Sequence, residues 1–439
     1  AGKGAIGIIR ISGPDCLNVV SKNLPTIKKW EPRKAILTKF QEANGNILDE
    51  VLLIYFSGPN SYTGEDVIEI SFHGSPFILE SAINEIIKNG AVLANPGEFT
   101  QRAFLNGKLD LVQAEAVGDL IASESRSAHM IAMSQMKGNV SKILEELRQK
   151  LIDFAALIEL ELDFTEEDVE FANRDQLSNL ITELKLEIQK MINSFNLGNA
   201  IKSGIPLIIV GEPNAGKSTL LNRFLEDDRA LVTDIAGTTR DSIEERFRLG
   251  DHLFRITDTA GLRKSNDKVE KLGIERSWRL MSEGHIILFL IDPLTSVKKN
   301  ILELEKDIKL RAPSAHLVKI LTKSDLWNGE NYHLDYPECI EIGIGSGLSQ
   351  IKSKLSSIID KTEWNGNSEI LIANIRHAKA LKTALDSILK AEKCLHDDSS
   401  GEIISYELRD ALESLGSITG EIIADDLLSS VFSRFCIGK

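Results

Sequence analysis

One short segment limits what this chain can fold into more than any other part of it. The apolar, β-branched run 207–210 is typical of a buried strand, and the residues that follow it, 211–218, read GEPNAGKS. Gly211 and Gly216 let the backbone wrap closely around a phosphate group, and the helix predicted over 219–225 adds the N–H groups of its first turn. The sequence therefore predicts a phosphate-binding loop within an α/β block. An ordinary glycine-rich turn is the alternative, which the flanking strand and helix disfavour.

The residue types in and after this loop suit a nucleoside triphosphate with Mg²⁺. Lys217 would place its charge on the β- and γ-phosphates, and Ser218 would bind Mg²⁺. Thr239 lies in a polar Gly-Thr-Thr-Arg-Asp segment and is the candidate switch threonine that completes the Mg²⁺ shell. A predicted strand ends at Asp258, whose carboxylate would hold the same shell, and the N–H group of Gly261 would meet the γ-phosphate. These spacings are those of a Ras-like GTPase.

Selection of the base depends on a segment that follows another predicted strand, 316–321. It reads Thr-Lys-Ser-Asp where such GTPases usually carry Asn-Lys-x-Asp. The carboxylate of Asp325 can accept both N–H groups of the guanine edge, and the stem of Lys323 can pack over the base. Thr322 replaces the Asn that ties this segment to the phosphate loop, and Gly-Ile-Gly at 343–345 replaces the usual Ser-Ala-Lys. We predict GTP as the nucleotide, bound more loosely by about 1 kcal/mol for a lost hydrogen bond.

The group that positions the attacking water is not where Ras-like enzymes have it. Their Gln is replaced by Leu262, whose apolar side chain cannot orient water. Glu270, in a helix predicted over 268–282, is the candidate to replace it, and a surface glutamate without a catalytic role is an equal alternative. No arginine is evidently placed to supply positive charge. A monovalent cation could do so, held by Asn214 and by backbone carbonyls of residues 233–238.

The α/β block lies between two helical segments. Residues 1–118 mix strand-like runs with turns, which predicts an N-terminal α+β domain. Residues 119–204 and 362–439 are rich in helix formers, with apolar residues three and four apart. Residues 205–361 alternate between strand and helix. We therefore expect one discontinuous helical domain around an inserted Ras-like domain, with a parallel-rich sheet and helices on both faces.

Composition excludes several classes of protein. The net charge is −14 and no large segment is basic, so the chain does not coat nucleic acid non-specifically, although a local patch could hold RNA. Its four scattered cysteines predict neither a zinc site nor a disulfide framework and favour a reduced, cytoplasmic setting. The longest apolar runs, such as 286–291, are too short for a membrane span. The chain starts at Ala1 without an initiator Met, so we expect it to begin inside the natural protein.

Longer segments outside the phosphate loop carry a more specific signal. They read GPNSYTGEDVIEISFHGSP at 58–76, NPGEFTQRAFLNGKLDLVQAEAV at 95–117, TDIAGTTRD at 233–241, DTAGLR at 258–263 and FCIGK at 435–439. Together with the phosphate loop, these segments resemble the MnmE/TrmE family of tRNA-modification GTPases over essentially the whole chain.

The resemblance implies an activity and its partners. Members of this family form a homodimer through the N-terminal domain, which binds 5-formyl-tetrahydrofolate or a related folate. Their GTPase domains dimerise across bound K⁺. With an FAD-dependent partner protein, in a heterotetramer, they install a carboxymethylaminomethyl-type group on carbon five of the tRNA wobble uridine. We therefore expect a cytoplasmic, K⁺-activated GTPase that uses Mg²⁺, binds GTP and GDP and acts on tRNA.

The resemblance also implies roles for individual residues. The folate site would comprise Arg10, Glu69, Lys108 and Lys439. The K⁺ site would comprise Asn214, Thr233, Ile235 and Thr238, and Mg²⁺ would bind Ser218 and Thr239. Glu270 matches the catalytic glutamate, and Cys436 matches a terminal cysteine whose part in the modification chemistry is open. The residues expected at the nucleotide are Asn214, Ala215, Gly216, Lys217, Ser218, Thr219, Thr233, Asp234, Ile235, Ala236, Gly237, Thr238, Thr239, Asp258, Thr259, Ala260, Gly261, Lys323 and Asp325.

Two other functions are compatible with a GTPase block. One is a regulatory GTPase switch in ribosome assembly, which the lack of an obvious RNA-binding module after the block disfavours. The other is a mechanochemical scaffold whose GTPase cycle only rearranges helical domains. It would leave the carboxylates and lysines of the N-terminal domain without a purpose.

Overall fold

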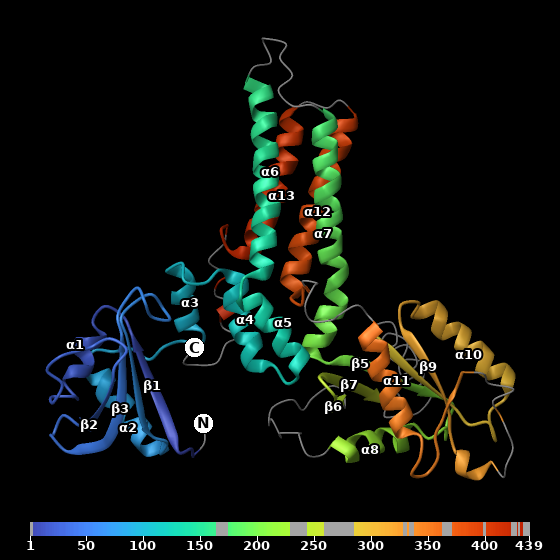
Figure 1. The fold of residues 1–439 in the computed structure, drawn as a ribbon, viewed down its shortest axis with the longest axis horizontal. Coiled ribbons are helices and arrows are strands. Elements are labelled where there is room, and N and C mark those ends of the chain that lie inside the picture. The colour runs from blue at the N-terminus through green and yellow to red at the C-terminus, as the bar shows by residue number, and fades with distance from the viewer. Residues whose placement is uncertain are drawn as a thin grey trace, which may run out of the picture. The chain divides into compact units, whose positions relative to one another are not determined.

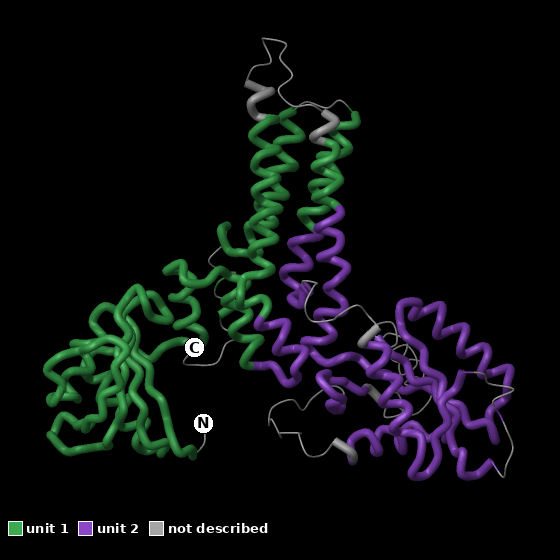
Figure 2. The backbone as a smooth tube through the Cα atoms, viewed as in Figure 1, with its two compact units in different colours: residues 1–121, 134–185, 383–439 green, residues 122–133, 186–382 purple. Residues whose placement is uncertain are grey.

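The computed structural model describes most of the chain, and its internal contacts divide it into two compact units. The described residues are 3–163, 174–228, 244–258, 285–327, 332, 338–361, 371–397, 401–422, 428, 431 and 432. Unit 1 comprises residues 1–121, 134–185 and 383–439, and unit 2 comprises residues 122–133 and 186–382 (Figure 2). Each unit is therefore assembled from segments that are distant in the sequence.

Unit 1 begins with a four-stranded antiparallel sheet in the order β1-β4-β3-β2. Its strands are β1 (Ile6–Ser12), β2 (Ala35–Gln41), β3 (Ile47–Phe56) and β4 (Val67–His73). Buried and less buried residues alternate along β3, as expected for a sheet with one covered face. Helices α1 (Cys16–Ser21) and α2 (Pro76–Lys88) contribute to the core on that face, where the rings of Phe40 and Phe72 meet edge to face. The predicted N-terminal α+β domain is confirmed.

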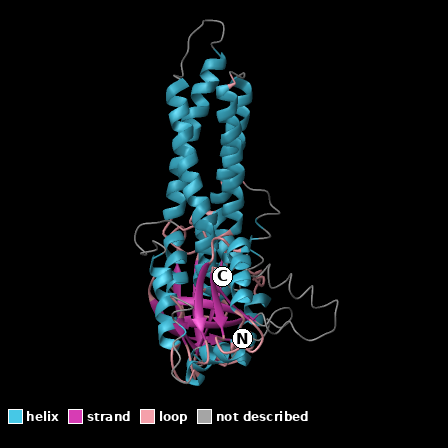
Figure 3. Cartoon of the chain, turned by 90° about the vertical axis from the view of Figure 1, so that its right-hand side faces the viewer, coloured by secondary structure: helices cyan, strands magenta, loops and turns pink. Residues whose placement is uncertain are grey.

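Helices form most of the chain between this sheet and a second one, and again after the second sheet (Figure 1, Figure 3). They are α3 (Glu98–Leu105), α4 (Leu111–Ala122), α5 (Arg126–Met136), α6 (Asn139–Asp163), α7 (Arg174–Ser203), α12 (Ile375–His396) and α13 (Gly401–Thr419). Helices α7 and α12 each contribute residues to both units. Within the described ranges, no helix is both long and apolar enough to cross a bilayer.

The helices before and after the second sheet pack together in unit 1. Lys150 of α6 pairs with Glu183 of α7 (2.5 Å), and Lys185 of α7 pairs with Glu392 of α12 (2.6 Å). Helix α13 packs directly along α6. These exposed or half-buried ion pairs add little stability, so the buried apolar faces of the helices supply most of it. The discontinuous helical domain predicted from the sequence is confirmed.

Unit 2 contains a six-stranded sheet in the order β10-β9-β8-β5-β7-β6. Its strands are β5 (Ile205–Gly211), β6 (Glu244–Leu249), β7 (His252–Asp258), β8 (Ile286–Ile291), β9 (His316–Leu321) and β10 (Ile340–Glu341). Strand β6 pairs antiparallel with β7, whereas β10, β9, β8, β5 and β7 pair in parallel. All six residues of β8 are buried, as is typical of a strand covered on both faces.

Helices cover both faces of this parallel-rich sheet. Helices α8 (Lys217–Asp228) and α11 (Leu348–Lys361) share a core with Leu207 and Ile209 of β5. Helix α10 (Lys298–Arg311) shares the opposite core with Ile208 and Val210. Since successive side chains of a strand point to opposite faces, the uninterrupted apolar run of β5 supplies both cores. The predicted Ras-like arrangement is confirmed.

The start of helix α5 is held against the turn between β6 and β7. The backbone N–H and the hydroxyl of Ser127 both donate to the carbonyl oxygen of Asp251, at 3.0 and 2.8 Å. The guanidinium of Arg246 lies 3.3 Å from the carboxylate of Glu124. Part of the helical region is therefore fixed to the antiparallel edge of the second sheet.

Candidate functional site

The first candidate site lies where the order of strands in the second sheet reverses. Strand β5 lies between β7 and β8, and its residue Ile209 is in register with Asp258 of β7 and with Leu288 of β8. The chain leaves β5, builds one side of the sheet and later returns to build the other. Open α/β sheets bind ligands at the carboxyl ends of their strands at such a point. Residues 211–218 leave the sheet there and lead into α8 (Figure 1).

The backbone of this loop has the shape of a phosphate cradle. Asn214 and Gly216 both have a left-handed conformation, with φ of +65° and +91°. A Cβ atom at Gly211 would lie 2.6 Å from the carbonyl oxygen of Leu290, so only glycine fits where the loop leaves the strand. Ala215 is fully buried beneath the turn. The loop therefore closes over its own core and leaves its outer side for a ligand, and these residues fit a phosphate group.

Positive charge gathers at the same place. Lys217 begins α8, and its ammonium donates to the carbonyl oxygens of Gly211 (2.8 Å) and Glu212 (2.7 Å). Ser218 and Thr219 follow in the first turn and are exposed. The N–H groups of a helix's first turn have no partners within the helix, and the helix dipole is positive there. The lysine and the helix end together suit an anion with several oxygen atoms.

The sheet brings one further predicted residue to this edge. Asp258 is the last residue of β7 and stands beside the end of β5. The other residues expected at the nucleotide, 233–239 and 259–261, lie outside the described part of the chain. The same holds for Glu270, Cys436 and Lys439.

The segment predicted to read the base follows β9. Asp325 is exposed, and its Oδ1 accepts a hydrogen bond of 3.0 Å from the N–H group of Ile344. The N–H group of Ser324 donates to the carbonyl oxygen of Ile342 (3.2 Å), and a Cβ atom at Gly343 would lie 2.6 Å from the hydroxyl of Ser324, so the two loops are in direct contact. Thr322 is buried, and its hydroxyl lies 3.3 Å from the carbonyl oxygen of Ile291. The structure thus joins the two segments that sequence reasoning assigned to guanine.

Sequence reasoning missed Asp292, a buried carboxylate beside this segment. It follows the apolar strand β8 and is 1% exposed. It accepts hydrogen bonds from the ammonium of Lys323 (2.6 Å), the hydroxyl of Thr295 (2.9 Å) and the N–H group of Leu294 (3.1 Å). Burial raises the pKa of Asp292, but these three donors outweigh it and hold the pKa below its ordinary value of 3.8. The ion pair fixes Lys323, whose φ of +59° is otherwise costly for a side chain with a Cβ atom. An acidic residue directly after a wholly apolar strand was the available signal.

The second candidate site lies in the N-terminal part of unit 1. Arg10 of β1 and Glu69 of β4 are cross-strand neighbours, and their side chains form a hydrogen bond of 2.8 Å. The guanidinium also lies within 6 Å of the rings of Tyr62 (5.7 Å) and Phe99 (5.8 Å). Arg10 and Phe99 line a cavity of about 650 Å³, within the usual range for small-molecule sites. Lys108 donates to the carbonyl oxygen of Pro59 (3.0 Å), in the segment that carries Tyr62.

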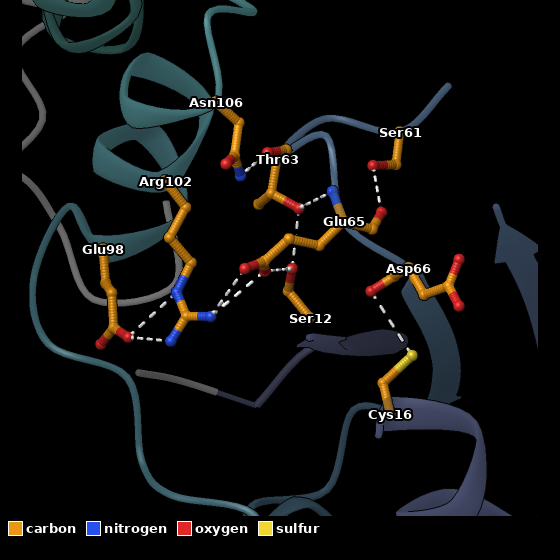
Figure 4. A network of polar contacts seen from close by, with 9 residues as sticks. All are labelled: Ser12, Cys16, Ser61, Thr63, Glu65, Asp66, Glu98, Arg102 and Asn106. Atoms are coloured by element: carbon orange, nitrogen blue, oxygen red, sulfur yellow. Dashed lines mark hydrogen bonds and ion pairs between the residues drawn. The ribbon is translucent and has the colours of Figure 1, made fainter. Parts of the chain in front are cut away.

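A polar network that sequence reasoning also missed lies beside this cavity, and Ser12, Glu98 and Arg102 of the network line it (Figure 4). Arg102 of α3 donates to Glu98 (2.6 Å) and to both carboxylate oxygens of Glu65 (3.1 and 3.2 Å). Glu65 also accepts a hydrogen bond from the hydroxyl of Ser12 (2.7 Å). The hydrogen bond to Glu98 raises the pKa of Arg102 above its ordinary value. Burial alone would lower this pKa, and the contacts with Glu65 raise it further. Arg102 lines the 650 Å³ cavity and a neighbouring one of about 410 Å³, so the network fixes the wall between them. Its glutamates and arginine lie within the family-like segments 58–76 and 95–117.

Comparison with known families covers both candidate sites. The family model for the N-terminus of the GTP-binding protein TrmE matches residues 1–108. The model for the MnmE helical domain matches residues 111–436. The chain belongs to the MnmE family. The family resemblance inferred from the sequence segments is thereby confirmed, and the region that contains both sheets lies within the matched residues.

Individual relatives agree with this assignment along their whole length. A protein of Bacteroides thetaiotaomicron named tRNA modification GTPase MnmE is 43% identical in sequence. The match covers 99% of this chain and 97% of that protein. One of the same name from Christiangramia forsetii is 42% identical to the full chain, over 97% of its own length. Among solved structures, that of Aquifex aeolicus Era bound to GDP and aluminium fluoride is similar over 42% of this chain and 66% of the Era chain. It is 19% identical, with a TM-score of 0.27.

The ion pair between buried Asp292 and half-buried Lys323 gives a testable pH dependence. Asp292→Asn keeps the shape of the side chain and removes the negative charge that pairs with the ammonium, so we expect a loss of about 1–3 kcal/mol of unfolding free energy at neutral pH. The pKa of Asp292 is lowered on folding, so its contribution is present above the unfolded pKa and is lost as pH falls through the lower folded value. In urea titrations followed by circular dichroism, the gap between variant and wild type should stay constant above about pH 5 and narrow only below about pH 4.

The control for this prediction is Asp307→Asn, which removes an exposed carboxylate from α10 and should change stability little. A gap that already closes near pH 6 would contradict the low pKa of Asp292.

Proposed function

We propose that this chain hydrolyses GTP and takes part in the modification of tRNA. The observation that carries the proposal is the phosphate loop 211–218 at the strand-order reversal, within a chain that matches the MnmE family along its length. Relatives that match this chain over 97% of their own length are named tRNA modification GTPases. The exposed carboxylate of Asp325, held by the backbone N–H group of Ile344, supports guanine as the base.

The nucleotide site is proposed to work with the residues that the sequence singled out. The loop N–H groups, Lys217 and the α8 N-terminus would hold the phosphates, and Asp325 would accept hydrogen bonds from guanine. Mg²⁺ would be held by Ser218 and Thr239 near Asp258, and when bound it would neutralise charge on the phosphates. The remaining nucleotide contacts would come from residues 233–239 and 259–261.

Hydrolysis is proposed to need two groups that Ras-like enzymes supply differently. Glu270 would orient the attacking water in place of the missing Gln. K⁺, held by Asn214, Thr233, Ile235 and Thr238, would supply positive charge when GTPase domains dimerise. The exposed position and left-handed backbone of Asn214 support its part in this site.

The wider function is proposed from membership of the family. The chain would act in the cytoplasm as a homodimer joined through its N-terminal domain. With an FAD-dependent partner, in a heterotetramer, it would install a carboxymethylaminomethyl-type group on carbon five of the wobble uridine. We propose its domains as 1–118, 119–204 with 362–439, and the inserted GTPase domain 205–361. Cys436 is a candidate for the modification chemistry.

The N-terminal cavity is proposed to bind 5-formyl-tetrahydrofolate or a related folate. Arg10 and Phe99 line this cavity, and the guanidinium of Arg10 pairs with Glu69 and lies 5.7 Å from the ring of Tyr62. This combination suits a flat heterocycle that carries hydrogen-bonding groups at its edge. Lys108 and Lys439 would complete the site.

The central test is nucleoside analysis of tRNA from cells that lack this protein. We expect the wobble-uridine modification to disappear and to return with the wild-type chain but not with Glu270→Ala, which should bind GTP without hydrolysing it. Glu303→Ala removes an exposed carboxylate on α10 and should restore the modification. Unchanged wobble uridines in the deleted cells would overturn the tRNA role and leave a GTPase switch in ribosome assembly as the next candidate.

Dependence on the cation can be tested with the purified chain. GTP turnover should be at least about tenfold faster in K⁺ than in Na⁺ at equal ionic strength, because no arginine of the sequence is evidently placed to supply this positive charge. Asn214→Ala should abolish this difference. Equal rates for the wild type in the two salts would refute the K⁺ assignment.

The folate proposal can be tested by calorimetric titration of 5-formyl-tetrahydrofolate into the full chain. Arg10→Ala should weaken binding about tenfold or more, because a charged hydrogen bond is lost. Lys29→Ala removes an exposed charge from the same unit and should leave the affinity unchanged. No binding by the wild type would count against a folate site.

A further inference from the structure

An arginine of helix α8 reaches the loop that follows β10. The guanidinium of Arg223 donates to the carbonyl oxygens of Gly343 (2.8 Å) and Ser346 (3.1 Å). Helix α8 begins at Lys217, directly after the phosphate loop, so Arg223 projects from its second turn. A guanidinium presents its donors in a rigid fork, and here the fork holds both ends of residues 343–346.

The loop held by Arg223 is restrained mainly by hydrogen bonds, which include one of 3.3 Å from the N–H group of Ser346 to the carbonyl oxygen of Gly343. Ile344 at its tip is 88% exposed, so apolar burial does little to hold it. Gly345 has a φ of +77°, a conformation that glycine adopts freely in both the bound and the released loop. Hydrogen bonds therefore decide where this loop lies.

The position of the loop also sets the orientation of Asp325. The N–H group of Ile344 donates to Oδ1 of Asp325, and Gly343 lies so close that an added Cβ atom would be 2.9 Å from the same oxygen. A shift of the loop would therefore release or displace the carboxylate. In the same segment, the hydroxyl of Thr322 contacts the carbonyl oxygen of Ile291, the last residue of β8.

We infer that Arg223 is a positioning residue for guanine recognition, which fixes the loop 343–346, and through it Asp325, to the helix that begins at the phosphate loop. This inference rests on the proposed binding of GTP and GDP. Arg223 links the base-reading loop to the phosphate-binding helix, the connection that Thr322 was expected to weaken. Its guanidinium donates to the backbone carbonyl oxygens of Gly343 and Ser346, so it would act on the base through the loop.

The ratio of GDP to IDP affinity reports this role directly. Guanine offers Asp325 two N–H groups, whereas hypoxanthine lacks the amine at carbon two. A well-oriented carboxylate therefore prefers GDP, and a poorly oriented one loses part of that preference. A variant that merely loosened the fold would weaken both nucleotides alike and leave the ratio unchanged.

The experiment compares Arg223→Met with wild type in the full chain. Methionine keeps an unbranched apolar stem and removes every donor. By calorimetry at fixed Mg²⁺ and K⁺, we expect the affinity for GDP to fall about tenfold and that for IDP to fall less, so the ratio drops at least about threefold. Asn222→Met, the same replacement at an exposed neighbour on α8, should keep the wild-type ratio.

The outcomes separate this inference from the proposed function. A wild-type chain that binds no GDP would refute the proposed function and the inference with it. If the wild type prefers GDP and Arg223→Met keeps that preference, only the positioning role is wrong. If Arg223→Met does not fold, Arg223→Lys decides, because an ammonium cannot hold both carbonyls in the fork geometry. An unchanged ratio in Arg223→Lys would then overturn the inference.

Discussion

The close approach of Gly211 to the carbonyl oxygen of Leu290 is the constraint on which the second unit depends. There is no room for a Cβ atom at this point, since it would lie 2.6 Å from that oxygen. The end of β5 can therefore stay paired with β8 while the chain turns out of the sheet. Ala215 fills the space under the turn, and the ammonium of Lys217 returns to the carbonyls of Gly211 and Glu212. A backbone contact, rather than any charged group, thus sets the site in place.

The sheet unites segments that the sequence keeps far apart. Strands β5, β8, β9 and β10 are parallel, so the loops after them emerge at one edge. Asp292 follows β8, Asp325 follows β9 and Gly343 follows β10. The contacts among these loops run largely through backbone groups and through the ion pair between Lys323 and the buried Asp292. They are therefore set by strand order and register more than by side-chain size.

The sequence was sufficient for the local features and insufficient for the distant ones. The strand, loop and helix around GEPNAGKS, and the helical segments on both sides, follow from periodicity and glycine placement within a short window. Asp292, Arg102 and Arg223 carry no such signal. An arginine in an amphipathic helix is expected from sequence to face solvent. Only the folded structure reveals that Arg223 donates to two carbonyl oxygens. The packing of helix α13 on α6 also has no local signal in the sequence, although the prediction of one domain from two helical segments implied such packing.

That helix pair has a consequence for the order in which the protein is made. Helix α6 is translated before the second sheet, and its partner α13 emerges from the ribosome only after that sheet is complete. The described strands and helices that build the two cores of the sheet lie between α6 and α13 in the sequence, so this part can fold while α6 still lacks α13. The face of α6 that α13 covers therefore stays open until the end of the chain is made, so the helical domain closes after the second sheet.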